Sequence, residues 1–230
     1  MKLTRLNLSL LIILIIITAD QLLKFWIKTH MMLGEEIHVF GNWFIIHFVE
    51  NNGMAFGLEL EGSYGKMVLS IFRVIAVFAI GWFLIKLSGK KTPWGFMVSL
   101  ALIFAGAIGN IIDSVFYGVL FDHSYGQVAK FLPEEGGYAG LLHGKVVDMF
   151  YFPIINSHYP EWFPFWGGDE LIFFRPVFNI ADSSITLGIF SILIFYKNFF
   201  NELSFKKAHQ QEKPEEQVIT MTDANTDEQA

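Results

Sequence analysis

The stretch FNIADSSITLG, residues 178–188, opens an apolar run of membrane-spanning length and places the carboxylate of Asp182 inside it. Charged side chains within a membrane span are energetically costly, so they usually face the protein interior and belong to a functional site. Asn179 lies three residues before Asp182, a spacing that also predicts a helix N-cap with the acid in the first turn. The stretch therefore predicts the start of a transmembrane helix and a candidate site within it.

The composition of the whole chain is typical of a membrane protein. Of its 230 residues, 53% are hydrophobic and 25 are Phe, which is too apolar for an ordinary soluble domain of this length. The chain has no Cys, so disulfides, thiol nucleophiles and cysteine metal sites are excluded. The sequence carries no basic stretch of the kind that binds nucleic acid, and no nucleic-acid partner is expected.

The negative charge of the chain is concentrated at its C-terminus. The net charge is −6, and residues 208–230 hold six acidic side chains against the single cation Lys213. This segment lacks the apolar residues that would offset the entropy of ordering the chain. We therefore expect residues 206–230 to form a disordered acidic tail in the cytoplasm.

Four segments are long and apolar enough to cross a bilayer as helices of about 20 residues. They are residues 6–27, 67–87, 94–117 and 177–199. The first segment could be a cleaved secretory signal, but its apolar pattern resumes beyond Asp20 with LLKFWI, which favours a retained helix. The expected fold class is an all-α membrane protein with four transmembrane helices in one domain, residues 1–205.

Basic residues indicate the orientation of these helices, because short cytoplasmic loops are rich in Lys and Arg. Both termini and the loop after residue 87 are therefore expected in the cytoplasm. The longer connections, residues 28–66 and 118–176, then face outward. The run HVFGNWFIIHFV, residues 38–49, is β-branched and aromatic and contains a Gly-Asn turn signal, so small β elements are expected on the outer surface. The basic residues are Lys2, Arg5, Lys86, Lys90, Lys91, Lys197, Lys206 and Lys207.

Each expected helix carries a charged residue in its outer half. At about 1.5 Å of rise per residue, Asp20, Asp113 and Asp182 lie roughly 6 to 10 Å below the outer ends of their helices. Arg73 occupies a similar place in the second helix. Asp148, in the apolar stretch KVVDMFYF, lies in an outer connection that can reach the same depth. This convergence predicts a site in the outer leaflet.

Several of these residues also have structural explanations. Asp20 and Lys24 are four residues apart on one helix face, the spacing of a local ion pair, and we interpret both as architectural. Asn110 and Asp113 share a helix face at a spacing of three and can support neighbouring loops. Asp148 has no local partner in its apolar stretch, which favours a functional carboxylate.

An acid pair fits these residues better than other chemistries do. The sequence contains no HExxH motif, and His123, His143 and His158 lack a recognisable ligand spacing, so neither a catalytic metal nor a cofactor is expected. A GxSxG elbow and a serine-lysine pairing are also missing. Two aspartates held close together share a proton, so one can activate water while the other donates a hydrogen bond to a scissile carbonyl. This is the chemistry of an aspartic peptidase.

Five motifs in order make the chain resemble lipoprotein signal peptidase, or signal peptidase II, a family of four-helix membrane aspartyl endopeptidases. Each motif alone is weak, but five in the family order with the matching topology are highly specific. The motifs are ADQLLK (19–24), NNGMAFG (51–57), GAIGNIID (106–113), VVDMF (146–150) and FNIADSSI (178–185).

The resemblance implies that Asp148 and Asp182 form a catalytic dyad. The implied reaction is hydrolysis of the bond just before the diacylglyceryl-modified cysteine of a prolipoprotein, at the outer leaflet of a bacterial inner membrane. Membrane lipids and the antibiotic globomycin are implied ligands. The motif positions that line or support the site are Asn51, Gly53, Asn110, Asp113 and Asn179.

Two features depart from the family pattern. Ser114 follows Asp113 where the family commonly has Arg, so the contact of that Arg is missing or is supplied by another residue such as Arg73. The connection from 118 to 145 is longer than the usual link before VVDMF, and a lid or a partner surface is a hypothesis for it.

Two other classes of protein compete with the peptidase. A carboxylate-based membrane transporter or proton relay would spread its acids across the bilayer, whereas these acids lie at one depth. A non-catalytic scaffold would use Asp20 with Lys24, and Arg73 with Asp113, as buried pairs. That reading leaves Asp148 and Asp182 unexplained.

Overall fold

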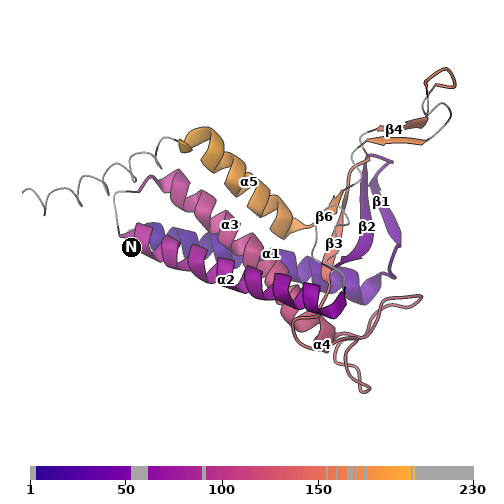
Figure 1. Ribbon diagram of the computed structural model, residues 1–230, viewed down its shortest axis with the longest axis horizontal. Helices are drawn as coiled ribbons and strands as arrows, with labels where there is room; N and C mark the ends of the chain where they lie inside the picture. Colours follow the sequence, from indigo (N-terminus) through magenta and orange to yellow (C-terminus); the bar gives the residue numbers. More distant parts are fainter. Residues whose placement is uncertain are drawn as a thin grey trace, which may run out of the picture. The chain divides into compact units, whose positions relative to one another are not determined.

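The computed structural model describes residues 4–52, 62–89, 92–153, 155–158, 160–164, 168, 170–173, 176–197 and 199. Within these residues the fold is mostly helical, with two small antiparallel sheets (Figure 1). Gly53 and the predicted tail, residues 206–230, lie outside the described residues. The chain divides into two compact units, Met1–Gly188 and Ile189–Ala230, and the described part of the second unit continues the last helix.

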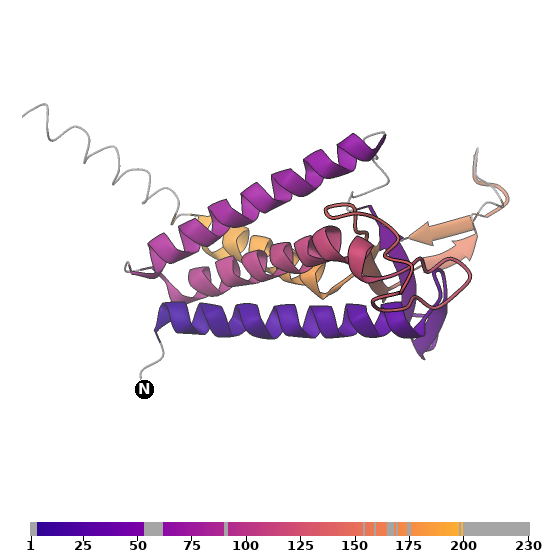
Figure 2. The same cartoon turned by 90° about the horizontal axis from the view of Figure 1, so that it is seen from below.

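The helical elements follow the apolar segments of the sequence. The central helix α3 packs against both α1 and α2, and Figure 2 shows it running between them. The helices are α1 (Arg5–His30), α2 (Gly62–Ser88), α3 (Trp94–Ile112), the π-helical turn η2 (Asp113–Tyr117), α4 (Gly118–Leu120) and α5 (Ile180–Phe195).

Three stretches of the described helices are long and apolar enough to span a membrane: Arg5–His30, Ser70–Ser88 and Trp94–Leu120. Helix α5 is apolar but shorter, at 16 residues. The segment expected as a helix from residue 177 begins three residues later, because Val177–Phe178 form strand β6 and Asn179 caps the helix. The described chain is thus a membrane protein with several apolar helices.

The polarity of α1 is inverted relative to a helix of a soluble protein. Leu14 and Leu22 are exposed on its outer face, while Asp20, Lys24 and Lys28 are buried inside. Apolar side chains pointing outward suit a hydrocarbon surrounding, and inward polar groups are tolerated only where they find partners. Helix α1 therefore carries its charged groups toward the interior of the protein.

The larger sheet has the strand order β1-β2-β3-β6, and its strands are antiparallel. Register irregularity between Ile46 and Val49 shifts the pairing of β2 with β3, so that Val49 pairs with Asp148 and Asn51 pairs with Val146. The expected strand region 38–49 is present as a hairpin. The strands are β1 (Glu36–Phe40), β2 (Phe44–Asn51), β3 (Val146–Tyr151) and β6 (Val177–Phe178), with β4 (Ile155–His158) and β5 (Glu170–Phe173) in the second sheet.

One face of β3 is covered by a hydrophobic core. Val147 and Met149 pack in this core, which joins the end of α1 to the sheet. Successive side chains of a strand point to opposite faces, so Asp148 points away from the core. The other buried core residues are Ile27, Met31, Phe48, Tyr117, Phe121 and Ala129.

The sequence predicts a regular α-helix over residues 94–117, but the α-helix ends at Ile112. It widens into the π-helical turn η2, whose first residue is Asp113. The carbonyl oxygens of Ser114 and Val115 accept hydrogen bonds from the backbone of Gly144 and Leu142, at 2.9 and 3.2 Å. These bonds from the 118–145 connection replace part of the regular helical pattern, and π-helical turns are frequent at functional sites.

Gly106 permits the close contact between α3 and the start of α5. A Cβ atom at this position would lie 2.2 Å from the carbonyl oxygen of Ala181 and 2.8 Å from Cγ1 of Ile185. Such a contact requires a backbone shift next to Asp182. Small residues of this kind commonly let helices approach closely in membrane proteins.

We expect Gly106→Ala to lower the free energy of unfolding by about 1–3 kcal/mol, because overpacking outweighs the better helix propensity of Ala. The measurement is the thermal unfolding of the purified protein in detergent. The matched control is Gly140→Ala, where a Cβ meets no described atom within 4 Å. Equal melting temperatures for the two variants would contradict the expectation.

Candidate active site

The first turn of α5 is closed by two hydrogen bonds between Asn179 and Asp182. Oδ1 of Asn179 accepts from the backbone N–H of Asp182 at 2.9 Å, and the backbone N–H of Asn179 donates to Oδ2 of Asp182 at 3.3 Å. The predicted N-cap is therefore confirmed. A carboxylate at this place also faces the partial positive charge of the helix N-terminus.

Asp148 lies in β3 on the face opposite the core and is only 3% exposed. Its Oδ1 accepts from Nδ2 of Asn179 at 2.7 Å, and its Oδ2 accepts from Nδ2 of Asn51 at 3.2 Å. Burial, followed by the nearby charge of Asp182, raises the pKa of Asp148 from 3.8 to about 7. Asn179 thus contacts both carboxyl groups, and its hydrogen bond to Asp148 reaches the acid whose pKa is raised.

The amide of Asn110 is held in one orientation by its neighbours. Its Oδ1 accepts from Nζ of Lys24 at 3.0 Å and from Nδ2 of Asn179 at 3.1 Å. Its Nδ2 is therefore turned toward Asp182 and donates to Oδ1 of that acid at 2.8 Å. Asp182 receives a donor from α3 in addition to its own helix cap.

Behind these residues lies a buried ion cluster formed by Asp20, Lys24 and Asp113. Nζ of Lys24, which is 0% exposed, lies 2.9 Å from Oδ2 of Asp20 and 2.8 Å from Oδ2 of Asp113. The expected ion pair between Asp20 and Lys24 is therefore present, and Asp113 joins it.

Each carboxylate of this cluster also binds a backbone N–H next to a candidate acid. Oδ1 of Asp20 accepts from the N–H of Ala181 at 2.9 Å. Oδ2 of Asp113 accepts from the N–H of Val147 at 3.2 Å. Because Ala181 precedes Asp182 and Val147 precedes Asp148, the cluster fixes the backbone at both acids.

The structure thus brings together nearly all residues that the sequence singled out. Asp113 pairs with Lys24, whereas the electrostatic partners of Arg73 are Asp182 and Asp148. This arrangement supports the hypothesis that Arg73 supplies a cation near the acids, and it differs from the pairing of Arg73 with Asp113 that a scaffold would use. Gly53 lies outside the described residues.

Sequence reasoning missed Gln21, although it lies inside the motif ADQLLK. Its Nε2 donates to Oδ1 of Asp113 at 2.9 Å and to the carbonyl oxygen of Gly109 at 3.1 Å. Its Oε1 accepts from the hydroxyl of Tyr117 at 3.2 Å. The signal that could have identified Gln21 is its amide within an apolar span, because a polar side chain in lipid needs hydrogen-bond partners inside the protein.

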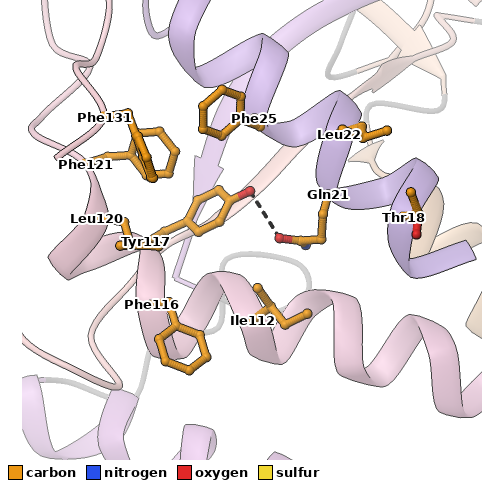
Figure 3. Close-up of a pocket in the computed structure, with 10 residues that line it drawn as sticks. All are labelled: Thr18, Gln21, Leu22, Phe25, Ile112, Phe116, Tyr117, Leu120, Phe121 and Phe131. Atoms are coloured by element: carbon orange, nitrogen blue, oxygen red, sulfur yellow. Dashed lines mark hydrogen bonds between the residues drawn. The ribbon is translucent and has the colours of Figure 1, made fainter. Parts of the chain in front are cut away.

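A cavity of about 370 Å³ lies between α1 and the η2–α4 turn (Figure 3). Its lining is apolar except at one side, where Tyr117 bonds to Gln21. The described lining residues include neither Asp148 nor Asp182. The polar groups suited to catalysis therefore lie outside this cavity, around the two aspartates. The remaining lining residues are Thr18, Leu22, Phe25, Ile112, Phe116, Leu120, Phe121 and Phe131.

Among the residues that the structure describes, no group of three His, Asp or Glu side chains is placed to hold a metal ion. The described site offers two carboxyl groups of different character and several amides. One carboxyl group accepts hydrogen bonds from Asn110 and from its own helix cap, and burial raises the pKa of the other, Asp148. Apolar helices with such a site are typical of a membrane-embedded acid–base enzyme.

Comparison with known proteins identifies the family. Residues 12–199 match the model of a family described as signal peptidase (SPase) II. The chain is 52% identical over 186 residues to the lipoprotein signal peptidase of Porphyromonas gingivalis, covering 80% of each chain. It is 35% identical over 191 residues to the lipoprotein signal peptidase of Amoebophilus asiaticus, covering 80% of this chain and 75% of that protein.

Two solved structures of bacterial membrane enzymes, both determined by the in meso method, resemble the chain. One is 28% identical with a TM-score of 0.56 and covers 89% of this chain and 94% of its own. The other is 30% identical with a TM-score of 0.54 and covers 84% and 94%. The chain belongs to the signal peptidase II family, whose members are membrane aspartyl endopeptidases that remove signal peptides from prolipoproteins.

Replacing Lys24 by Met would leave Asp20 and Asp113 without their shared cation. We expect the free energy of unfolding to fall by about 3–5 kcal/mol, because breaking a buried ion pair leaves an uncompensated charge. Thermal unfolding in detergent measures the effect. The control is Lys130→Met at an exposed lysine, and the expectation would be wrong if both variants unfolded at the temperature of the wild type.

Proposed function

We propose that the chain cuts diacylglyceryl-modified prolipoproteins just before the lipidated cysteine, with Asp148 and Asp182 as its two catalytic acids. The observation that carries this proposal is the double contact of Asn179. The Asn179 side chain caps the helix that bears Asp182, and its Nδ2 donates a hydrogen bond to Oδ1 of Asp148 at 2.7 Å. The charge of Asp182 raises the pKa of Asp148, and this coupling favours a single proton on the pair, as an aspartic peptidase requires.

The different surroundings of the acids suggest their roles. Asp182 accepts hydrogen bonds from Asn110 and from its own helix cap, and we assign it the role of the base. Asp148 is the protonated acid because burial and the charge of Asp182 raise its pKa to about 7. Arg73 lies within electrostatic reach of both and limits the accumulation of negative charge.

In the first step Asp182 takes a proton from a water molecule, whose oxygen bonds to the scissile carbonyl carbon. Asp148 gives its proton to the carbonyl oxygen, so the intermediate is a neutral diol. In the second step Asp182 gives its proton to the amide nitrogen, and the C–N bond breaks. Asp148 recovers its proton from the diol, which leaves a carboxyl group on the signal peptide and an amine on the lipidated cysteine.

Five other residues are proposed to support these steps without exchanging protons. Asn51, Asn110 and Asn179 orient the carboxyl groups, as their hydrogen bonds suggest. Asp113 holds the strand of Asp148, and Gly53 is proposed to line the site by family resemblance. Asp20 and Lys24 have the architectural role of fixing α5 and α3.

The proposed topology has four spans in a domain of residues 1–205, with the helix α5, Ile180–Phe195, in the fourth. We expect both termini, including the acidic segment from residue 206, in the cytoplasm, because the loops on that side carry the basic residues. The site then lies at the outer leaflet of a bacterial inner membrane. Acyl chains hold the lipidated cysteine at that leaflet, so its peptide bond comes to the depth of the acids. Membrane lipids and globomycin are the further ligands we expect.

We expect Asp148→Asn and Asp182→Asn each to lower the cleavage rate by about two to four orders of magnitude, because neither amide can replace an acid or a base. The assay is cleavage of a diacylglyceryl-modified prolipoprotein peptide by the purified protein in detergent. Glu134→Gln is the control, since it makes the same change on an exposed side chain. Full activity of a folded Asp148 or Asp182 variant would refute the proposed dyad.

The proposal also determines the pH dependence of cleavage. The pKa of Asp148 is raised to about 7, so its proton is present below that pH and is lost above it. We expect kcat/KM to decline as the pH rises through about 7. The apparent pKa belongs to the coupled pair of acids.

Asn51→Ala provides the companion measurement. The hydrogen bond from Asn51 lowers the pKa of Asp148, so its removal should move the alkaline decline of kcat/KM to higher pH. A decline that stays at the same pH in this variant would count against Asp148 as the group that titrates.

A further inference from the structure

A second buried charge cluster lies on the core side of the sheet and has no part in the chemistry above. It contains Glu50 of β2, Lys28 of α1, and Ser124 and Lys145 from the 118–145 connection. The side chains of Lys28 and Glu50 are 0% and 3% exposed. Buried charges of this kind require partners, so the cluster needs an explanation.

Both oxygens of the Glu50 carboxylate are engaged by cations. Oε1 pairs with Nζ of Lys28 and accepts from Oγ of Ser124 at 3.1 Å. Oε2 accepts from Nζ of Lys145 at 3.3 Å. Burial alone would raise the pKa of Glu50, but Lys28, Lys145 and the Ser124 hydrogen bond outweigh burial and hold the pKa below its usual value. Glu50 therefore stays ionised and joins two lysines.

Aromatic rings enclose the ammonium group of Lys28. Its Nζ lies 4.9 Å from the ring centre of Tyr138, 5.7 Å from that of Phe121 and 6.0 Å from that of Phe48. These distances permit cation–π attraction, which is stronger where water is excluded. Two of the three rings belong to the 118–145 connection, so Lys28 ties this connection to α1.

The cluster lies at the ends of the two strands that form the candidate site. Glu50 directly precedes Asn51, and Lys145 directly precedes β3. In the sheet Glu50 pairs with Val147, and Asn51 pairs with Val146. The ion pair between Glu50 and Lys145 therefore joins β2 to β3 beside the point where Asn51 donates to Asp148.

The 118–145 connection supports this junction from the core side of β3. The backbone N–H of Lys145 donates to the hydroxyl of Tyr138 at 2.6 Å, and Nζ of Lys145 donates to the hydroxyl of Tyr125 at 3.0 Å. Phe121 packs in the core with Val147, on the face opposite Asp148. Through these contacts the 118–145 connection supports β3 on the face opposite Asp148.

We propose that Glu50 is a positioning residue for the catalytic acids, acting through Asn51 by holding the ends of β2 and β3 together. Lys28 and Lys145 are its anchors on α1 and on the 118–145 connection. The inference rests on the proposed role of Asp148. It also gives the additional length of the connection a function, namely to complete the charge cluster that aligns the strand of Asp148.

The test is Glu50→Gln, assayed for cleavage of the lipid-modified prolipoprotein peptide by folded protein in detergent. We expect kcat to fall about 10-fold to 100-fold with KM changed less than about two-fold, because small displacements of catalytic groups have effects of this size. Glu36→Gln is the matched control, since Glu36 pairs with His47 at 2.8 Å in the same sheet but is 39% exposed. This control should retain the kcat of the wild type.

A double-mutant cycle with Asn51→Ala separates positioning from a general loss of stability. If Glu50 acts through Asn51, Glu50→Gln should lower kcat by less than two-fold in the Asn51→Ala background. Wild-type kcat in folded Glu50→Gln, or fully additive effects in the cycle, would overturn the inference. The proposed function fails separately, if Asp148→Asn remains active.

Glu50→Gln leaves two buried lysines without their carboxylate, and the variant can fail to fold for that reason. In that case the double variant Glu50→Gln with Lys28→Gln is tested in place of Glu50→Gln. It removes one negative and one positive charge, so the net charge of the cluster is unchanged. The same fall in kcat and the same coupling to Asn51 are expected of this double variant. Wild-type kcat in the folded double variant would likewise overturn the inference.

Discussion

The site depends on one ammonium group, that of Lys24, placed between the carboxylates of Asp20 and Asp113. A buried ion cluster stabilises a fold only when it is complete, since any unpaired member is a charge in a medium of low dielectric constant. The two carboxylates also accept the backbone N–H groups of Ala181 and Val147. Helix α5 and strand β3 are consequently held at the residues that precede the candidate acids.

Close backbone contacts make this arrangement possible. A Cβ at Gly109 would lie 2.7 Å from Oδ2 of Asp20, and a Cβ at Gly144 would lie 2.1 Å from the carbonyl oxygen of Asp113. Glycine at position 109 lets α3 approach Asp20 of α1, and glycine at position 144 lets the segment before β3 approach Asp113. The apolar exterior of α1 faces the opposite way, so polar interior and apolar surface are separated on a single helix.

Local spacing explains which parts of this structure could be predicted from the sequence. The Asn179 cap and the Asp20–Lys24 pair each depend on residues within about one turn, and both are present. Of the four apolar segments, three are described as helices long enough to span a membrane, and the fourth contains the shorter helix α5. The pairing of Glu50 with Lys145 joins residues 95 positions apart, and the register shift in β2 places Asn51 opposite Val146. Neither has a local signal, because both follow from how distant segments pack. The π-helical turn was missed for the same reason, since its freed carbonyls bond to residues 142 and 144.

Asn179 has two structural tasks in this protein. Its oxygen starts a helix, and its nitrogen serves the neighbouring strand through Asp148. A substitution at this position would disturb the folding of the first turn of α5 and the state of both acids together. Mutations that stabilise an enzyme often reduce its activity, and the reverse. At Asn179 the two properties cannot be changed separately, because one side chain makes both the hydrogen bond that caps α5 and the hydrogen bond to Asp148.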